Sequence, residues 1–287
     1  MGSHGIGHRP RRRFSQHFLA PAWAQRVVVA VAPVPGDVFV EIGPGTGALT
    51  LPLAATGAPI LAVEIDRDLA QRLAAEVPSN VTVLTGDFLK ADVVPLLSGL
   101  QAQRPPDSHP RETPPARYRI VGNLPYHLSS PMIAHLVALH RQTARFADAT
   151  LMLQREVASR LAARPGTHDY GALSVLVQMH TVATRLLDLP PGAFTPPPKV
   201  RSTLIRLSFH PPVARVVDEP AFDRLVKALF SQRRKTLANA LKRFDRAGPA
   251  VLEQSGLDGR RRPETLQVKE IARLAELLAS IHRGPVL

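Results

Sequence analysis

The chain has 287 residues, of which 45% are hydrophobic, and its 36 basic and 23 acidic residues give a net charge of +13. This hydrophobic content can build a core, which excludes a disordered or collagen-like chain, and the charge favours a polyanionic partner, either a nucleic acid or an anionic membrane surface. Cysteine is absent, which excludes disulfides, thiolate-bound zinc, iron–sulfur clusters and a cysteine nucleophile.

Strand and helix patterns alternate along most of the chain. Residues 1–36 are expected to form a basic segment with a first helix. After them, apolar runs predict strands and amphipathic stretches predict helices. The strands are expected at 38–42, 60–63, 81–84, 119–121, 151–153, 181–187 and 203–209, and the helices at 49–55, 66–76, 130–140 and 156–163. Such units build a mostly parallel sheet with helices on both faces, which binds ligands at the carboxyl ends of its strands.

Two further segments complete the predicted organisation. Residues 98–117 are rich in proline and lack periodicity, so we expect an insertion loop there. Beyond residue 212 the pattern is helical only, with helices expected at 221–230, 235–244 and 271–282. The sequence therefore predicts an α/β domain over 37–212 and a small all-helical domain over 213–287.

Polar and glycine residues follow the first three strands. Glu41-Ile-Gly-Pro-Gly-Thr-Gly47 comes directly after the first strand, and its glycines, Gly43 and Gly45 among them, allow a ligand to approach the backbone closely. Glu64 ends the second strand and can accept both hydroxyls of a ribose, while Asp87 ends the third and can receive an adenine amine. The spacing is GxGxG rather than the GxGxxG of a dinucleotide site, so S-adenosylmethionine fits better than NAD.

The fourth strand ends in Asn123-Leu-Pro-Tyr126. Pro125 biases Leu124 toward an extended conformation, so that carbonyl oxygens and the Asn123 side chain can face a planar base while Tyr126 offers a stacking surface. Accepting the hydrogens of an adenine amine returns electron density to its nitrogen, which can then attack a sulfonium methyl group in line. Methylation at a pyrimidine carbon would need a cysteine, which this chain lacks.

Seven motifs follow one another along the chain: Phe14-Ser-Gln-His-Phe-Leu19, Glu41–Gly47, Val63-Glu-Ile-Asp66, Gly86-Asp87, Asn123–Tyr126, Phe194-Thr-Pro-Pro-Pro-Lys-Val200 and Phe230-Ser-Gln-Arg-Arg-Lys-Thr236. With these motifs in this order, the sequence resembles the KsgA/RsmA-type small-subunit ribosomal RNA adenine dimethyltransferases from about residue 11 to the C-terminus.

The resemblance implies a Rossmann-like class I S-adenosylmethionine-dependent methyltransferase sheet with a helical ribosomal RNA-binding domain. It implies dimethylation of the N6 amines of two adjacent adenosines in the 3′-terminal hairpin of 16S ribosomal RNA, and a role in ribosome biogenesis. It implies that the cofactor site is formed by His17, Leu19, Gly43, Glu64, Asp87 and Asn123. It implies that Asn123 and Leu124 accept the hydrogens of the adenine amine, and that Tyr126 and Phe194 make aromatic contact with the base.

Clusters of basic residues lie at both ends of the chain. Residues 1–26 carry five arginines and no acid, and residues 214–287 carry 15 basic and nine acidic residues, so nearly all of the net charge flanks a neutral centre. We expect these ends to hold the phosphate backbone of ribosomal RNA in the small subunit. The residues predicted to do so are Arg11, Arg12, Arg13, Arg233, Arg234 and Lys235.

The chain has no apolar run of the roughly 18 residues that a membrane span needs, and its N-terminus lacks the apolar core of a signal peptide. We therefore expect a cytoplasmic protein. By default we also expect a monomer, and no metal site. Two other functions fit parts of the pattern: an erythromycin-resistance-type 23S ribosomal RNA adenine methyltransferase, and a non-catalytic RNA-binding assembly factor. An NAD-dependent dehydrogenase fits least.

Overall fold

The computed structural model describes residues 17–102, 117–231 and 234–283. The chain divides into two compact units. The sheet unit comprises Met1–Ala158 and Thr184–Leu207, and the helical unit comprises Ser159–Ala183 and Ser208–Leu287. Among the described residues, no helix has the length and apolar character needed to cross a membrane.

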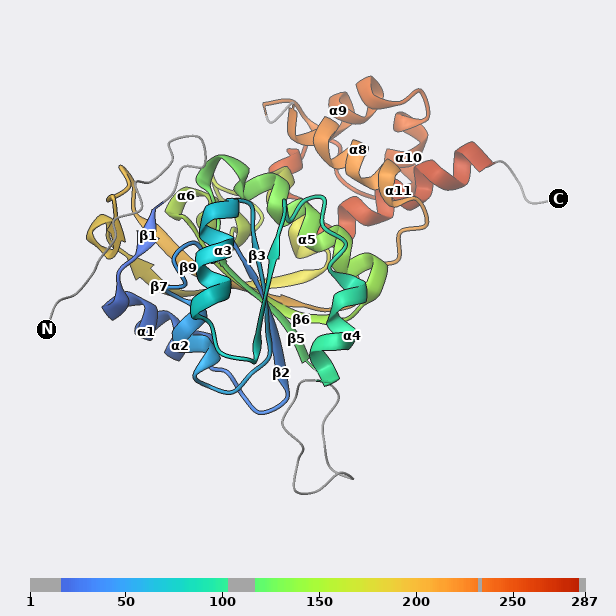
Figure 1. Ribbon diagram of the computed structural model, residues 1–287. Helices are drawn as coiled ribbons and strands as arrows, with labels where there is room; N and C mark the ends of the chain where they lie inside the picture. The colour runs from blue at the N-terminus through green and yellow to red at the C-terminus, as the bar shows by residue number, and fades with distance from the viewer. Residues whose placement is uncertain (1–16, 103–116, 232–233, 284–287) are drawn as a thin grey trace, which may run out of the picture. The chain divides into compact units, whose positions relative to one another are not determined.

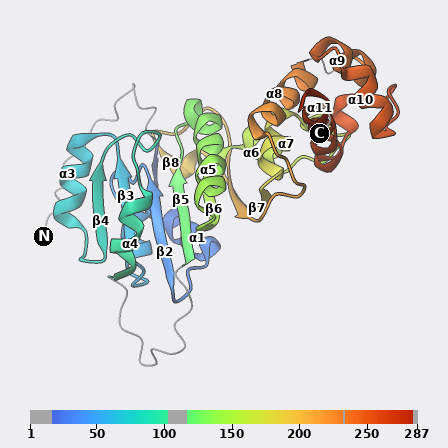
Figure 2. The ribbon, with the colours of Figure 1, turned by 90° about the vertical axis from the view of Figure 1, so that its right-hand side faces the viewer.

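A seven-stranded sheet has the order β4-β3-β2-β5-β6-β9-β7, and the neighbouring pairs from β4 to β6 are parallel (Figures 1 and 2). A separate antiparallel pair joins β1 to β8. The strands are β1 Phe18–Leu19, β2 Asp37–Ile42, β3 Ile60–Glu64, β4 Val81–Thr85, β5 Arg117–Asn123, β6 Phe146–Gln154, β7 Thr181–Leu189, β8 Phe194–Thr195 and β9 Ser202–Phe209.

Helices follow the strands of the parallel part and form most of the helical unit. The helices up to β7 are α1 Pro21–Val31, α2 Thr50–Ala54, α3 Arg67–Glu76, α4 Val94–Ala102, α5 Ser129–Thr143, α6 Arg155–Leu161 and α7 Ala172–Gln178. Those after β9 are α8 Glu219–Ser231, α9 Leu237–Phe244, α10 Gly248–Ser255 and α11 Val268–Arg283.

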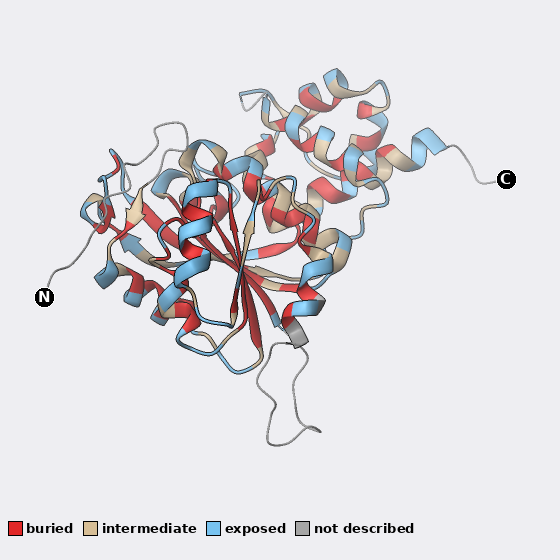
Figure 3. Ribbon diagram, viewed as in Figure 1, coloured by how far each residue is buried: buried red, intermediate tan, exposed pale blue. Residues whose placement is uncertain are grey.

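Burial explains why the apolar runs form strands and the amphipathic stretches form helices. All six residues of β2 and all five of β3 are buried, as expected for central parallel strands covered on both faces. Helix α3 buries Leu69, Ala70 and Leu73, and Asp66 caps it by accepting a hydrogen bond of 3.1 Å from the Asp68 amide. Figure 3 shows the same division, with buried strands inside and exposed helix faces outside. The predicted fold class is confirmed.

The insertion predicted over 98–117 is wrong at both of its ends. Residues up to Ala102 belong to α4, and β5 already begins at Arg117. Helix α4 forms because Leu97 and Leu100 are buried, with exposures of 0% and 3%; the proline content of the segment begins only beyond them. Residues 103–116 lie outside the described part of the chain.

The helical unit has its own hydrophobic core, in which α8, α9, α10 and α11 pack with residues that precede β7. Tyr170 is fully buried and donates a hydrogen bond of 3.0 Å to the Leu266 carbonyl, and the Gly166 amide donates one of 2.7 Å to the Glu264 carbonyl. These contacts explain why 159–183 group with the C-terminal helices, a division that differs from a single boundary near residue 212.

A buried ion cluster lies at the amino ends of β2, β5 and β6. Arg119 is 2% exposed and donates hydrogen bonds to Asp37 at 2.7 Å and to Asp148 at 2.9 Å. It also donates to the Val31 carbonyl at the end of α1, at 2.8 Å. Burial opposes the charge, but the two carboxylates outweigh burial and raise the pKa of Arg119. This cluster fixes α1 to the edge of the sheet opposite the carboxyl ends of the parallel strands.

Candidate functional site

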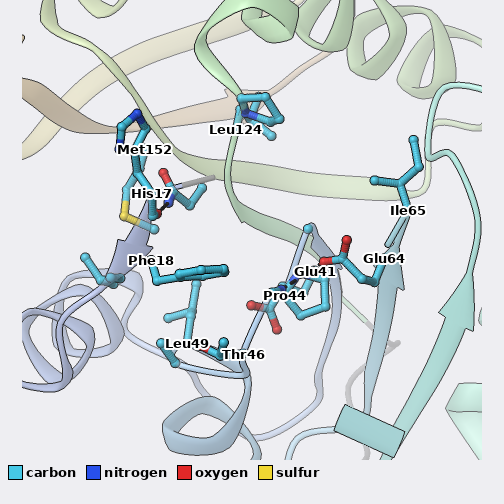
Figure 4. Close-up of a pocket in the computed structure, with 16 residues that line it drawn as sticks. His17, Phe18, Glu41, Pro44, Thr46, Leu49, Glu64, Ile65, Leu124 and Met152 are labelled. Atoms are coloured by element: carbon cyan, nitrogen blue, oxygen red, sulfur yellow. Dashed lines mark hydrogen bonds between the residues drawn. The ribbon is translucent and has the colours of Figure 1, made fainter. Parts of the chain in front are cut away.

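A pocket lies at the carboxyl ends of the parallel strands, where the strand order changes direction between β2 and β5. This is the place where open parallel sheets bind ligands. Residues from β1, β2, β3, β5, β6 and the loop after β2 converge on it (Figure 4). They are His17, Phe18, Leu19, Glu41, Gly43, Pro44, Gly45, Thr46, Ala48, Leu49, Glu64, Ile65, Asn123, Leu124, Pro125 and Met152.

The glycine turn after β2 forms one wall of the pocket. Gly43 and Gly45 have φ angles of +65° and +60°, in the left-handed region that other residues rarely adopt. A Cβ atom on Gly45 would lie 3.1 Å from the ring of Phe18, another lining residue, whereas one on Gly43 would have no atom within 4 Å. The turn therefore lets Phe18 pack against the backbone and leaves open space beside Gly43 for a ligand.

Two buried carboxylates lie in the same pocket, and Figure 4 shows both. Glu64 is 4% exposed and accepts hydrogen bonds of 2.9 Å from the amides of Gly45 and Asp66. Burial raises the pKa of Glu64, and these amides partly offset the shift. A carboxylate offers about four acceptor positions, so Glu64 retains capacity for ligand hydroxyls.

Glu41 is the second carboxylate and is only 2% exposed. Burial raises its pKa to about 7; the Thr50 hydroxyl opposes this shift and nearby Glu64 adds to it. Its Oε2 atom has no hydrogen-bond partner among the described residues. An unpaired buried acceptor is costly, so the pocket favours a ligand that carries a cationic or N–H donor group.

The segment that starts at Asn123 forms the opposite side of the pocket. The Asn123 amide nitrogen, Nδ2, donates a hydrogen bond of 2.7 Å to the His17 carbonyl. Because only Nδ2 can donate, this bond fixes the orientation of the side-chain amide and leaves Oδ1 as its acceptor atom. The Leu124 amide donates a bond of 3.3 Å to the Met152 carbonyl, which ties the segment to β6.

Tyr126 begins a short 3₁₀ helix, Tyr126–Leu128, beside the pocket. Its hydroxyl lies 2.6 Å from Ser202 Oγ in a hydrogen bond, and burial raises its pKa. The His17 ring stacks on Tyr126 with 5.6 Å between centroids and 25° between planes, and His17 Nδ1 donates a bond of 2.7 Å to the Pro196 carbonyl. The aromatic ring is thus held from two sides.

The structure brings most of the residues predicted for the site into one pocket. His17, Leu19, Gly43, Gly45, Glu64, Asn123, Leu124 and Pro125 all line it. Tyr126 contacts this group through His17.

Asp87 and Phe194 are not among the lining residues. Asp87 follows β4 and accepts a hydrogen bond of 3.1 Å from the Leu89 amide. Phe194 is 2% exposed, pairs with Leu19 in the β1–β8 ladder and packs in the hydrophobic core. The roles in adenine binding and base stacking stay predictions for these two residues.

The basic residues predicted to bind RNA are only partly described. Arg11, Arg12, Arg13 and Arg233 lie outside the described residues, while Arg234 and Lys235 are exposed in the helical unit. Their binding role stays a prediction.

Sequence reasoning did not single out several lining residues, among them Phe18, Glu41 and Met152. Glu41 carried a usable signal, because it is an acid within the otherwise apolar run 38–42, two residues before Gly43, and acids are rarely fully buried in a core. Met152 lies near the carboxyl end of β6, an edge that the sheet topology already marks as the ligand side. Phe18 gave no local signal, since only the pairing of β1 with β8 brings it to the pocket.

Comparisons with known proteins agree on one family. A family model described as "Ribosomal RNA adenine dimethylase" matches residues 7–280. The "Ribosomal RNA small subunit methyltransferase A" of Aromatoleum aromaticum is 42% identical over 277 residues, which cover 95% of this chain and 96% of that protein. The protein of the same name from Vibrio cholerae is 38% identical over 282 residues and covers 97% of both chains.

Solved structures show the same similarity. A dimethyladenosine transferase from Plasmodium falciparum aligns with a TM-score of 0.68 and 25% identity, over 90% of this chain and 96% of that chain. The 23S rRNA methyltransferase ErmE aligns with a TM-score of 0.60 and 25% identity, over 92% of this chain and 100% of that chain.

Proposed function

Because the chain belongs to the ribosomal RNA adenine dimethylase family and is a methyltransferase, we propose that it dimethylates the N6 amines of two adjacent adenosines in the 3′-terminal hairpin of 16S ribosomal RNA. The observation that carries this proposal is the pocket itself, which joins the Asn123 segment to the glycine turn and Glu64. The substrate is the RNA within the small ribosomal subunit, the setting is ribosome biogenesis in the cytoplasm, and the protein acts as a monomer.

S-adenosylmethionine is the methyl donor that fits the pocket. Glu64 has acceptor capacity for the ribose hydroxyls, the unpartnered Oε2 of Glu41 suits a cationic or N–H donor group, and the space beside Gly43 admits a ligand. When bound, this cofactor supplies an electrophilic methyl group on a sulfonium. Asp87, at the end of the neighbouring strand, is proposed to receive the adenine amine, and His17 and Leu19 are proposed to contact the cofactor from β1.

The protein's own contribution to the reaction is to hold and orient the target amine. Asn123 Oδ1, fixed by the bond from Nδ2 to the His17 carbonyl, accepts one N6 hydrogen, and the Leu124 carbonyl accepts the other. The lone pair of the amine nitrogen is delocalised into the adenine ring. Accepting the two N–H hydrogens returns electron density to the nitrogen, and the fixed position supplies much of the rate. No strong base is needed, because the proton leaves after transfer.

The target base has to leave its stack to reach this pocket. Tyr126 is half-buried, with its hydroxyl held by Ser202 and one face covered by His17, so the base stacks on its remaining face. Phe194 is proposed as the second aromatic contact; in the structure it is buried beside Leu19 in the β1–β8 pair.

The test is to incubate the protein with labelled S-adenosylmethionine and under-methylated small subunits, and to map the modified nucleotides by mass spectrometry. We expect two adjacent adenosines to gain two methyl groups each, and Asn123→Ala to slow the transfer about 100- to 1000-fold. Tight subunit binding by wild-type protein without any transfer would contradict the proposal.

A large-subunit substrate is the second candidate, favoured by the alignment with ErmE over nearly the whole chain. The same assay with large subunits decides between the two, because label on a single 23S adenosine would replace the expected pair in 16S RNA. The small-subunit substrate is favoured because the more similar relatives, at 38% and 42% identity, carry that name.

A further inference from the structure

A group of exposed cations lies beside Tyr126, on the sheet unit and away from the basic chain ends. Arg155 directly follows β6, Lys199 and Arg201 precede β9, and Arg185 lies on β7; all four are exposed. The Arg155 amide donates a hydrogen bond of 3.0 Å to the Arg201 carbonyl, which holds the end of β6 next to the start of β9. We call these four residues, Arg155, Arg185, Lys199 and Arg201, the cation rim.

Contacts with the pocket residues fix where the rim lies. The segment 196–202 is held at its start by the bond from His17 Nδ1 to the Pro196 carbonyl at 2.7 Å, and at its end by the bond between Ser202 Oγ and the Tyr126 hydroxyl at 2.6 Å. Pro198, between these points, is buried. Lys199 is three residues from either end, so its Cα lies within roughly 11 Å of the Cα atoms of Pro196 and Ser202. Arg155 is three residues beyond Met152, which lines the pocket.

The charges of the rim are available for a ligand. No ion pair joins Arg155, Lys199 or Arg201 to an acid among the residues that the structure describes. Arg185 pairs with Asp188 at 3.1 Å, and Asp188 also accepts a bond of 2.8 Å from Thr203. The Thr203 hydroxyl, followed by Arg185 and Arg155, lowers the pKa of Asp188, which therefore stays ionised. Even with Asp188 and Glu156 counted, cations outnumber acids in this group.

Exposed apolar surface accompanies this charge. Val200, between Lys199 and Arg201, is 44% exposed. Cations around an apolar contact fit the alternating sugar and phosphate groups of an RNA strand. A charged surface that only keeps the protein soluble would not need to be fixed to pocket residues, whereas the segment 196–202 is bound to them at both ends.

We propose that Arg155, Lys199 and Arg201 bind the phosphates on either side of the adenosine that enters the pocket. This inference rests on the proposed function, because it assumes an RNA strand with an extruded base. A flipped nucleotide keeps its two backbone phosphates at the mouth of the pocket, and cations at that position hold the strand while the base reaches Tyr126. The rim contributes to binding of the RNA and leaves the cofactor site unchanged.

The test compares Lys199→Gln/Arg201→Gln with Arg145→Gln. Arg145 is a matched control, because it is an exposed arginine just before β6, at the end of the strand opposite Arg155. We expect the double variant to raise KM for small subunits about tenfold, with kcat and the Kd for S-adenosylmethionine unchanged. Between 50 and 200 mM salt, its RNA affinity should depend less steeply on salt, by roughly 0.7 in the logarithmic slope for each phosphate that the variant no longer binds.

The charge-retaining variant Lys199→Arg should keep the wild-type KM, and thermal unfolding should show all variants folded. Three outcomes would each overturn the proposal. The double variant and Arg145→Gln could have equal effects, the salt slope could stay unchanged, or the loss could be confined to kcat or to cofactor binding. A separate measurement distinguishes failure of this proposal from failure of the proposed function. If wild-type protein transfers no methyl group, the affinity of the same variants for an RNA hairpin with two unpaired adenosines still tests the rim, and absence of RNA binding by wild type overturns both.

Discussion

The two edges of the parallel sheet bury charge in opposite ways. At the amino edge, Arg119 lies between Asp37 and Asp148 and also donates to carbonyls at the end of α1, so its charge is paired. At the carboxyl edge, Glu41 and Glu64 are about as deeply buried, and the charge of Glu64 helps to raise the pKa of Glu41. Neither carboxylate forms an ion pair with a cation among the described residues, and Glu41 Oε2, like Asp37 Oδ1 at the other edge, has no hydrogen-bond partner there.

The difference separates a group that serves the fold from one that serves a ligand. A paired buried charge is stable as the chain stands, and losing one partner leaves the other uncompensated. Buried carboxylates without a cation lower the stability of the protein until a ligand supplies the missing charge or hydrogen bonds. Such carboxylates are typical of functional sites. Four substitutions test this contrast, from the largest expected effect to the smallest.

Removing the cation at the amino edge should cost most. Arg119→Met leaves Asp37 and Asp148 buried without a counter-charge, so we expect the free energy of unfolding to fall by about 3–5 kcal/mol. Urea unfolding at pH 7 measures this. Replacing both acids by asparagine in the same variant should restore much of the loss. A loss below about 1 kcal/mol would show that the cluster does not hold the sheet edge.

Removing the acceptor at the carboxyl edge should affect the reaction instead. For Asn123→Ala we expect methyl transfer to fall about 100- to 1000-fold, the range for one group that stabilises the reacting centre. The free energy of unfolding should fall by only about 1 kcal/mol, because the bond to the His17 carbonyl is removed. Single-turnover transfer and urea unfolding of the same preparation separate the two effects. Asn123→Asp keeps an acceptor oxygen but cannot donate to His17, so transfer that is as slow as in the alanine variant would assign the effect to orientation.

Neutralising Glu41 should stabilise the protein while weakening cofactor binding. Its pKa is raised from 4.5 to about 7 in the folded state, so the fold favours the protonated form. The stability that protonation of Glu41 contributes is therefore fully present below about pH 4.5 and is lost as the pH rises through about 7. Glu41→Gln should be more stable than wild type at pH 8, by at most about 3 kcal/mol, and the advantage should shrink toward pH 5.

Unfolding curves at several pH values check this prediction, and calorimetry should show affinity for S-adenosylmethionine reduced about tenfold, as for the removal of one charge-assisted bond. Equal stability of wild type and Glu41→Gln at pH 8 would mean that Glu41 is satisfied in the folded protein.

The glycine turn should show the smallest effect. Gly45→Ala forces a left-handed residue with a Cβ 3.1 Å from the Phe18 ring, so we expect a loss of about 1–2 kcal/mol together with weaker cofactor binding. Gly57→Ala is the matched control: its φ of +81° imposes similar backbone strain, but no atom lies within 4 Å of the added Cβ. Thermal unfolding of both variants measures the strain, and cofactor binding should weaken only at Gly45. Equal cofactor affinity in the two would mean that the contact with Phe18 is irrelevant to the pocket.

Much of the sheet could be predicted from the sequence because its central strands are apolar on both faces. The runs 38–42 and 60–63 are strands that end directly at the pocket, so the residues that follow them, Gly43 and Glu64, were predicted together. Parallel sheets gather strand ends at one edge, which turns a linear order of motifs into a spatial one.

Some features were missed because local composition misled the prediction, and others because they depend on pairing between distant residues. Helix α4 was missed because the prolines beyond it dominated the composition of the segment, although Leu97 and Leu100 are buried. The burial of Phe194 beside Leu19 follows from the β1–β8 pairing, which local sequence does not show, and its contact with the base stays a prediction. The assignment of 159–183 to the helical unit depends on contacts such as that of Tyr170 with the Leu266 carbonyl, about which local periodicity says nothing.

The β1–β8 pair sets an order of events during synthesis of the chain. His17, Phe18 and Leu19 are made before their partners at 194–196, and 179 residues of sequence separate His17 from Pro196. Such a long sequence separation makes the closing contact late and slow relative to the local strand–helix units. The cofactor pocket is therefore incomplete in a nascent chain whose central parallel strands are already present, and the protein acquires its site only once β8 has emerged.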